Sequence, residues 1–367
     1  MRIALVVTGG VDRSGRENVI PILLTLIERL ARRHDVTVYV LRYHATPTTY
    51  PLLGATVRDL GRPTGACRQY RRLVSALAQD GPVDVIHGYW ALPGGLVAAA
   101  AGRRLGVPVV VTCNSGEFVG IPDIAYGSQL RLRQRAAVAA TTRMAHRVTV
   151  DTQYQADLAR RLGVSTEIVP LGVDSKIFVP GVRLEGPPWR LLHVGSLNPV
   201  KDHATLLGAV QVLARRGIDV HLDCVGEDTM DGSAARLASE RAVADRVTFY
   251  GFRPTAALVP FYQRSHVFVL SSRHEATGVV LLEAAACGVP IVGTAVGFIA
   301  DWAGQAAVAV RPREPEQLAD AIQALLADRP RRERLAGTAR QWTLAHDADW
   351  TAAAFERVYA EAITPGS

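Results

Sequence analysis

Cysteine is scarce in this chain of 367 residues, and its four cysteines, Cys67, Cys113, Cys224 and Cys287, lie far apart. None belongs to a Cys-x-x-Cys pair or stands at a spacing typical of cysteine and histidine zinc ligands. This argues against a disulfide framework and a structural zinc site, and it favours a reducing cytoplasm as the compartment.

Long apolar runs are also absent. No run approaches the ~20 residues that cross a bilayer, so we expect no transmembrane helix. The apolar stretch Ile3–Val7 is too short for a signal peptide and runs into glycines, which indicates a buried first strand. Apolar residues make up 49% and charged residues 20% of the chain, which excludes wholesale disorder, and the length fits two globular domains.

Lysine is nearly missing, because 39 of the 41 basic residues are arginine and only Lys176 and Lys201 remain. Where plain positive charge is enough, this chain uses arginine. A retained lysine can therefore mark a place that needs a compact ammonium, although chance retention explains it as well.

The positive charge is concentrated in the first half of the chain. Residues 1–170 hold 21 basic against 12 acidic residues, whereas residues 171–367 hold 20 against 22. The basic half predicts an anionic partner, either an acidic lipid surface at the inner face of the membrane or a phosphorylated acceptor; a solvated basic face is the alternative. Aromatic residues do not alternate with the arginines, so we expect no nucleic acid partner.

Short apolar runs alternate with helical stretches along the whole chain. The runs are continuous, which is typical of parallel strands covered on both faces. They predict two doubly wound α/β domains, 1–172 and 173–345, with a linker at the proline- and glycine-rich Val179–Pro188 and a last helix, about 346–367, packing back on the first domain. The expected strands are Ile3–Val7, Val36–Leu41, Asp84–His87, Val109–Thr112, Val148–Asp151, Arg190–Val194, Val220–Val225, Val247–Tyr250, Val267–Leu270, Pro290–Gly293 and Ala307–Val310.

The strongest group of candidate site residues lies in SSRHEATGVVLLEAAACGVPIVGT, residues 271–294. A buried strand ends there, a polar loop carries Glu275, and a helix carries Glu283 one turn from its start. Between the two carboxylates lie the free N–H groups of the helix start, Gly278 to Val280, and such a helix end binds phosphate. The pattern suits a ligand with a diphosphate between two sugars. The alternative is an ordinary helix in which one glutamate caps the helix and the other is solvated.

Two further loops join a strand to a helix. In HVGSLNPVKDHATLL, residues 193–207, Lys201 can reach a diphosphate and Asp202 can cap the helix, whereas His193 has the position of a packed core histidine. The loop after the first strand carries Gly10 and Gly15, which would let the backbone approach a ligand closely. It lacks Gly-x-Gly-x-x-Gly, and a plain tight turn is the alternative.

Five segments resemble motifs of the retaining glycosyltransferases of family 4, which have the GT-B fold. Their order and spacing along the chain also agree with that family. The segment from Glu275 to Glu283 resembles the E-x7-E motif of that family. The other four are SGRE at 14–17 followed by HDVTV at 34–38, VPLGVD at 169–174, GSLNPVKD at 195–202, and YGFRP at 250–254.

The resemblance implies two Rossmann-like domains that face each other across a cleft, the first for the acceptor and the second for the nucleotide-sugar donor. It implies that Glu275 bonds the hydroxyls of the donor sugar, that Glu283 holds the ribose and that Lys201 neutralises the leaving diphosphate. The remaining donor-binding residues that it implies are Gly278, Val279, Val280, Ser196, Arg253, Gly15 and Gly10.

The chain departs from the family pattern at two positions. The family usually has arginine where Ser196 stands, so one phosphate charge is missing or comes from elsewhere. In CNSGEF, residues 113–118, Asn114 stands where many members have histidine, and asparagine cannot act as a general base. We expect Asn114 to orient the sugar and Glu117 to orient an acceptor hydroxyl. His87, at another strand end, is a further acceptor-side candidate, with a structural role as the alternative.

The resemblance, together with the site residues, implies a retaining, hexosyltransferase-type enzyme that moves a sugar from a UDP-, GDP- or ADP-sugar to a hydroxyl acceptor in cell-envelope or exopolysaccharide synthesis. We expect no cofactor and no metal, because Lys201 and a helix N-terminus would meet the charge of the leaving diphosphate. The acceptor would be a lipid-linked or other glycan, or a small phosphorylated molecule. The alternatives are a nucleotide-sugar epimerase and a non-catalytic nucleotide-sugar binding module, which Ser196 and Asn114 would favour.

Overall fold

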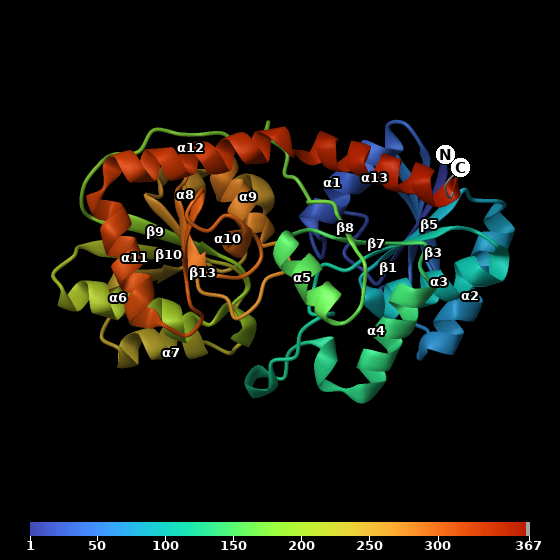
Figure 1. Cartoon of the computed structure of the whole chain (residues 1–367), viewed down its shortest axis with the longest axis horizontal. Helices are drawn as coiled ribbons and strands as arrows, with labels where there is room; N and C mark the ends of the chain where they lie inside the picture. The colour runs from blue at the N-terminus through green and yellow to red at the C-terminus, as the bar shows by residue number, and fades with distance from the viewer. Residues whose placement is uncertain (365–367) are drawn as a thin grey trace. The chain divides into compact units, whose positions relative to one another are not determined.

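The computed structural model describes residues 1–364 and divides the chain into two compact α/β units (Figure 1). Unit 1 comprises Met1–Leu171 and the segment that begins at Ala348, and unit 2 comprises Gly172–Asp347. The predicted linker at Val179–Pro188 is wrong, because this segment lies inside unit 2. There the Arg183 guanidinium donates hydrogen bonds to the carbonyl oxygens of Cys287 (2.8 Å) and Gly288 (2.9 Å).

The sheet of unit 1 has the strand order β3-β4-β2-β1-β5-β6-β7-β8 and is parallel except for the antiparallel pair β3–β4. Its strands are β1 (Arg2–Val7), β2 (Asp35–Val40), β3 (Thr48–Leu52), β4 (Ala55–Asp59), β5 (Val85–Tyr89), β6 (Val109–Thr112), β7 (Arg147–Val150) and β8 (Glu167–Ile168). Its helices are α1 (Pro21–Ala31), α2 (Ala66–Asp80), α3 (Leu96–Leu105), α4 (Leu132–Met144), α5 (Gln153–Arg161) and α13 (Ala348–Ile363).

The sheet of unit 2 is parallel throughout, with the order β11-β10-β9-β12-β13-β14. Its strands are β9 (Trp189–Val194), β10 (Val220–Val225), β11 (Val247–Phe249), β12 (Val267–Leu270), β13 (Ile291–Thr294) and β14 (Ala307–Val310). Its helices are α6 (His203–Arg215), α7 (Ser233–Glu240), α8 (Thr255–Arg264), α9 (Val279–Ala286), α10 (Phe298–Asp301), α11 (Pro315–Ala327) and α12 (Arg329–Ala345).

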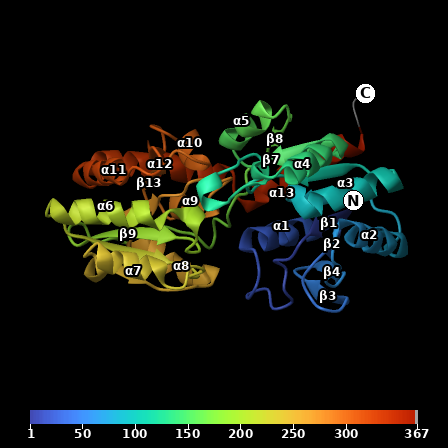
Figure 2. The ribbon, with the colours of Figure 1, turned by 90° about the horizontal axis from the view of Figure 1, so that it is seen from below.

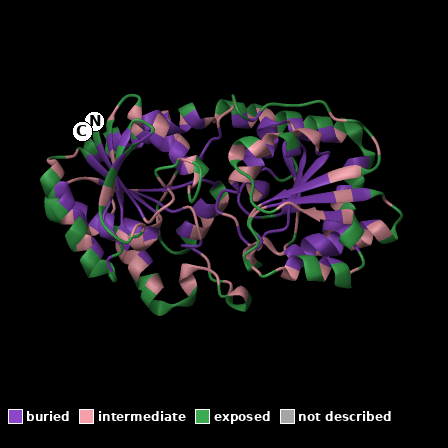
Figure 3. Cartoon of the chain, turned by 180° about the vertical axis from the view of Figure 1, so that it is seen from behind, coloured by how far each residue is buried: buried purple, intermediate pink, exposed green. Residues whose placement is uncertain are grey.

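Helices lie on both faces of the strands in each unit (Figure 2). The strands are therefore buried on both sides, and the exposed residues lie mainly on the outer faces of the helices (Figure 3). This arrangement explains the continuous apolar runs of the sequence. Each unit has its own hydrophobic core on either side of its sheet.

Helix α13 packs on unit 1 through the fully buried rings of Phe355 and Tyr359. The hydroxyl group of Thr351 adds a hydrogen bond of 2.7 Å to the carbonyl oxygen of Pro170. Among residues 1–364, no helix is both long and apolar enough to span a membrane.

Three strands were not expected from the sequence. Strands β3 and β4 form an antiparallel pair at the sheet edge, and buried and more exposed residues alternate along them. Strand β8 has two residues, Glu167 and Ile168. Edge strands need only one covered face, so they lack the continuous apolar run that marks a central parallel strand.

Candidate functional site

Lys201 and Glu275 form an ion pair in unit 2. Lys201 closes the short 3-10 turn Pro199–Lys201, which the side chain of Asn198 caps, and Glu275 lies in the loop after β12. The ammonium of Lys201 bonds Oε1 of Glu275, and the two side chains are 18% and 11% exposed. The Ser272 hydroxyl donates to the same oxygen at 2.6 Å, which fixes the carboxylate.

The two loops that carry this ion pair are tied together. The Ser271 hydroxyl donates to the carbonyl oxygen of Lys201 (2.7 Å), and the backbone N–H group of Arg273 donates to that of Val200 (2.7 Å). A Cβ atom placed on Gly195 would lie 3.2 Å from Cε of Lys201, so the lysine side chain crosses this glycine. The ion pair is therefore held by backbone contacts on both sides.

The start of α9 lies beside this pair. Gly278 precedes the helix with a φ of 76°, no side chain caps the helix, and its first N–H groups have no partner within the helix. A Cβ atom on Gly278 would lie 3.8 Å from Cγ of Glu275. The structure thus places an ammonium, a carboxylate and an open helix N-terminus side by side, which is an arrangement suited to a diphosphate.

Glu283 lies one turn further along α9 and is buried, with 7% exposure. Burial raises the pKa of Glu283 to about 7, and the Tyr262 hydroxyl opposes this rise by donating to Oε2 at 2.6 Å. Val279 and Val280 are partly buried and pack against the core of unit 2. The carboxyl group of Glu283 therefore titrates near neutral pH.

The other donor-side candidates lie at the surface of unit 2. Ser196 is exposed, as is Arg253, whose guanidinium donates to the carbonyl oxygen of Phe252 at 2.8 Å. His193, by contrast, is fully buried, with Nδ1 3.0 Å from the carbonyl oxygen of Val269. Burial lowers the pKa of His193 well below its ordinary value, so this residue is a neutral core histidine.

In unit 1, the geometry of the loop itself explains the two candidate glycines. Gly10 has a φ of 82°, and a Cβ atom there would lie 2.6 Å from Cδ1 of Ile20. Gly15 has a φ of 63° and lies in a turn in which the Asp12 carboxylate accepts a hydrogen bond of 2.8 Å from the backbone N–H group of Ser14. Both positions require glycine for the turn, whether or not a ligand binds there.

Glu117 is 3% exposed and anchors the loop after β6. Its two carboxylate oxygens accept the backbone N–H groups of Ser115 (2.7 Å) and Ala91 (3.3 Å), and burial raises its pKa. Oδ1 of the neighbouring Asn114 is buried without a hydrogen-bond partner among residues 1–364. Both carboxylate oxygens of Glu117 thus accept backbone hydrogen bonds, whereas the side-chain oxygen of Asn114 is still available as a hydrogen-bond acceptor.

His87 lies in the core of unit 1 and is fully buried. Nδ1 is 2.8 Å from the Tyr359 hydroxyl and Nε2 is 2.7 Å from the Thr112 hydroxyl, so both ring nitrogens have partners. Burial lowers the pKa of His87 to about 3. This position supports the structural alternative, in which His87 joins α13 to the sheet.

A cavity of about 510 Å³ lies at the carboxyl ends of β1, β5 and β6 in unit 1. Trp90 contributes to its wall and has a φ of 59°, which is unusual for a residue with a side chain and is found at strained functional positions. The lining residues are Thr8, Trp90, Leu92, Ser115, Gly116, Glu117, Ala125, Tyr126, Gly127, Ser128, Leu130, Arg131 and Gln134.

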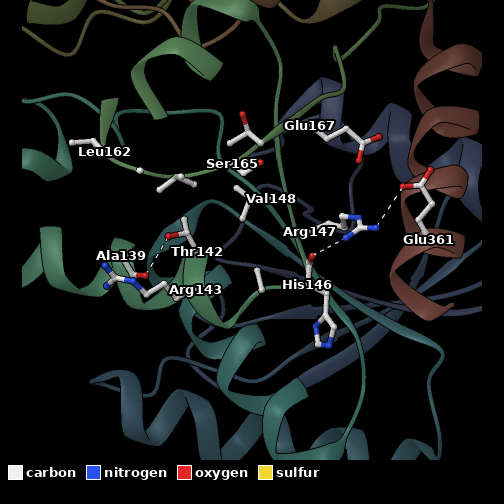
Figure 4. A pocket seen from close by; sticks show the side chains of 14 residues that line it. Ala139, Thr142, Arg143, His146, Arg147, Val148, Leu162, Ser165, Glu167 and Glu361 are labelled. Atoms are coloured by element: carbon white, nitrogen blue, oxygen red, sulfur yellow. Dashed lines mark hydrogen bonds and ion pairs between the residues drawn. The ribbon is translucent and has the colours of Figure 1, made fainter. Parts of the chain in front are cut away.

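A second cavity, of about 560 Å³, lies at the amino ends of β7 and β8. Its charged groups largely face one another, because Arg147 lies between Glu167 and Glu361 and is 3.8 Å from the carboxylate of Glu361 (Figure 4). Ligands of open parallel sheets bind at the carboxyl ends of the strands. The cavity beside Trp90 is therefore the better candidate for a substrate site.

Two family models and a set of relatives match the chain. The model described as glycosyl transferases group 1 matches residues 176–342, and the model described as glycosyl transferase 4-like domain matches residues 19–173. A D-inositol 3-phosphate glycosyltransferase from Frankia alni is 30% identical over 315 residues, which cover 79% of this chain and 77% of the relative. The chain belongs to glycosyltransferase family 4.

Solved structures place this glycosyltransferase in the GT-B fold. Sucrose-phosphate synthase from Thermosynechococcus elongatus aligns with a TM-score of 0.82 at 21% identity, covering 98% of this chain and 99% of that one. HepE from Anabaena, solved with UDP and glucose, aligns with a TM-score of 0.76 at 17% identity, covering 98% and 100%. The predicted family and fold are confirmed.

Sequence reasoning missed the residues that hold the candidate groups of the glycosyltransferase in place. Ser272 fixes Glu275 and Tyr262 fixes Glu283, and a Cβ atom on Gly297 would lie 3.1 Å from Cβ of Glu275. Tyr262 and Gly297 are distant from these glutamates in the sequence, so no local pattern connects them. Trp90 had a local signal, because it directly follows a buried strand in HGYW.

Proposed function

We propose that this glycosyltransferase transfers a sugar, with retention of its anomeric configuration, from a nucleoside diphosphate sugar to a hydroxyl group of an acceptor. The observation that carries the proposal is the Lys201–Glu275 ion pair beside the open N-terminus of α9. A partly buried cation and amides that have no partner within the helix attract a diphosphate, and a fixed carboxylate accepts hydrogen bonds from sugar hydroxyls.

In this proposal, each charged group of the ion pair exchanges its partner when the donor binds. Lys201 and the amides at Gly278 and Val279 bind the diphosphate, while Glu275, still held by Ser272, accepts hydroxyl groups of the sugar. Glu283 accepts the ribose hydroxyls. Without a donor the two charges neutralise each other, which limits the cost of holding them in a partly buried site.

The proposed step breaks the bond between C1 of the sugar and the diphosphate oxygen and forms a bond between C1 and the acceptor oxygen on the same face. The acceptor proton passes to the departing phosphate oxygen, so no side chain has to act as a base. The occupied state of His87 and Glu117 supports this route, because both are engaged in hydrogen bonds within unit 1.

We assign acceptor binding to the cavity beside Trp90. It combines aromatic and apolar walls with hydroxyl, amide and guanidinium groups, which suits a sugar or polyol with an anionic group. Relatives are named D-inositol 3-phosphate glycosyltransferases, and HepE was solved with UDP and glucose. UDP-sugars and D-inositol 3-phosphate are therefore the first donor and acceptor to test.

The proposal is tested in two steps. A thermal-shift screen of UDP-, GDP- and ADP-sugars identifies the donor, because a bound ligand raises the apparent stability by mass action. The selected donor, radiolabelled in its sugar, is then incubated with the candidate acceptors, and NMR of the product gives its anomeric configuration. Conversion of the donor without any acceptor would favour the epimerase, and donor binding with no nucleotide release in any mixture would favour the binding module.

A further inference from the structure

The segment that leads into α4 is both strongly basic and exposed. Between Asp123 and Asp151 the chain has five arginines and no acidic residue. Three of the arginines, Arg131, Arg133 and Arg135, alternate with leucines and a glutamine in LRLRQR, and the side chains of Leu130 and Leu132 are 37% and 78% exposed. We call Leu130–Arg135 the arginine–leucine edge; it comprises the last two residues before α4 and the first turn of that helix in unit 1 (Figure 1).

The arginines of this edge have no ion-pair partner among residues 1–364. The first turn of α4 carries no acidic residue and its N-cap residue, Arg131, makes no capping hydrogen bond through its side chain. Positive side chains at this end of a helix are unfavourable, because the helix dipole is also positive there. The arrangement therefore does not stabilise the helix. An anionic surface outside the chain would offset the repulsion between the arginines and the positive end of the helix dipole.

Exposed leucines beside arginines match one kind of anionic surface. At the interface of a bilayer, leucine side chains enter the boundary of the acyl region while arginines contact the lipid phosphates. A soluble polyanion would satisfy the arginines and leave Leu132 in water. The combination thus favours an anionic lipid surface over a soluble anion.

The edge is continuous with the candidate acceptor cavity. Leu130, Arg131 and Gln134 line that cavity, whereas Leu132, Arg133 and Arg135 do not. We propose that the arginine–leucine edge docks on an anionic membrane and places the mouth of the cavity at the lipid surface, so that the acceptor is a membrane-anchored molecule. The acceptor part of this inference rests on the proposed function, and the docking part does not.

The test measures binding to vesicles without donor or acceptor. We expect the full chain to sediment with vesicles of phosphatidylcholine and phosphatidylglycerol but not of phosphatidylcholine alone, and added salt should weaken the binding. In the variant L132Q/R133Q/R135Q, the loss of two arginines alone should weaken partitioning roughly 30-fold, at about 1 kcal/mol for each basic residue.

Helix α3 of the same unit provides a matched control. Arg103, Arg104 and Leu105 are also two arginines and a leucine, and all three are exposed at its C-terminal end. R103Q/R104Q/L105Q removes the same charge, yet it should retain wild-type vesicle binding. Unchanged unfolding temperatures and unchanged shifts on donor binding would establish that both variants are folded.

The possible outcomes separate docking from catalysis. Equal losses in the two variants would mean a diffuse basic surface and would overturn the proposal, as would wild-type binding to neutral vesicles or no binding at low salt. If vesicle binding follows the expected pattern while no transfer is found with any donor, the proposed function fails and the docking surface stands. If transfer to soluble acceptors is found without vesicle binding, the docking surface fails alone.

Discussion

Lys201 is the partly buried cation of the proposed donor site, and its replacement tests the role of that charge. We expect Lys201→Ala to lower kcat/KM by roughly 100- to 1000-fold, as for other preorganised groups that stabilise developing charge. Binding of the nucleoside diphosphate should weaken far more than binding of the nucleoside, measured by calorimetry. The matched control is Lys176→Ala, which replaces the other lysine of the chain, an exposed residue, and should leave both unchanged.

The carboxylate of Glu275 serves the sugar in our proposal, so its loss should affect a different quantity. Glu275→Gln should lower turnover strongly and leave the affinity for the free nucleoside diphosphate nearly unchanged, because that ligand has no sugar at this position. Ser272→Ala should reproduce part of the effect by freeing the carboxylate. Equal losses of turnover and nucleotide affinity in Glu275→Gln would contradict the sugar-side role.

Glu283 makes stability depend on pH. Burial raises the pKa of Glu283 from 4.5 to about 7 in the folded chain. Between these two pH values, the Glu283 carboxyl group is ionised in the unfolded chain but protonated in the folded chain. The free energy of unfolding should therefore fall as the pH rises from about 4.5 to 7, by roughly 3 kcal/mol from this group. Urea unfolding at a series of pH values should show this fall, relative to Glu283→Gln, which lacks it.

Tyr262→Phe is the control for this titration. Its hydroxyl group stabilises the ionised carboxylate, so its removal should raise the pKa of Glu283 further and extend the fall in stability to higher pH. If the free energy of unfolding had the same pH dependence in Tyr262→Phe as in the wild type, a group other than Glu283 would be responsible for it.

Single residues differed in how far the sequence could predict them. Glu275, Glu283 and Lys201 were found because they lie in motifs of fixed spacing. Their partners Ser272 and Tyr262 were not. Ser272 lies three residues before Glu275 in the same loop, so this contact is local although no motif marks it, whereas Tyr262 is 21 residues from Glu283 and meets it only through tertiary packing. His87 had the sequence position of a site residue, and only the structure reveals the hydroxyl groups that occupy both of its nitrogens.

At the scale of elements, the loop of Glu275 is packed against the start of α10. Gly297 has a φ of 52°, and a Cβ atom there would lie 2.9 Å from the carbonyl oxygen of Thr277 and 3.1 Å from Cβ of Glu275. Gly297→Ala should therefore displace this loop and lower turnover, in addition to a cost of about 1–3 kcal/mol for holding a residue with a side chain at this positive φ.

Gly304→Ala separates the two effects of that substitution. Gly304 has a φ of 77° and no atom within 4 Å of an added Cβ, so this variant carries the backbone cost alone. Its unfolding free energy should fall and its turnover should not. A similar loss of turnover in both variants would mean that stability, rather than the position of Glu275, limits activity.

Elements were predictable where both faces are covered. The central strands of both sheets were found from continuous apolar runs, and Asp202 caps α6 as expected, by accepting the N–H group of Thr205 at 3.2 Å. The strands β3, β4 and β8 at the edges of unit 1 were missed, because buried and exposed residues alternate there or the strand is too short.

At the scale of the whole molecule, composition was a poor guide to where the chain passes between its units. Val179–Pro188 has the composition of a linker, but Arg183 binds it to the end of α9, and Glu185 pairs with Arg332 at 2.8 Å. The chain passes between the units at Leu171–Gly172 and again at Asp347–Ala348, where proline and glycine do not cluster in the same way. Contacts distant in sequence decide these boundaries.

Metal dependence is a property of the whole molecule. The arrangement of charges in unit 2 predicts whether transfer requires a divalent cation. The sequence has one Asp-x-Asp triplet, Asp347 to Asp349, but Asp347 accepts the Ser175 hydroxyl at 3.2 Å and Asp349 pairs with Arg29 at 3.4 Å. Within residues 1–364, no group of three or more His, Cys, Asp and Glu side chains is placed to hold a metal ion.

We propose that Lys201 and the amides of α9 supply the positive charge that a divalent cation would otherwise supply to the leaving diphosphate. Transfer should therefore continue in EDTA, and added Mg²⁺ should stimulate it little. In Lys201→Ala, by contrast, Mg²⁺ should restore part of the lost turnover, because the cation can then occupy the place of the ammonium beside the diphosphate. Loss of wild-type activity in EDTA that returns with Mg²⁺ would instead assign the charge of the leaving group to a metal.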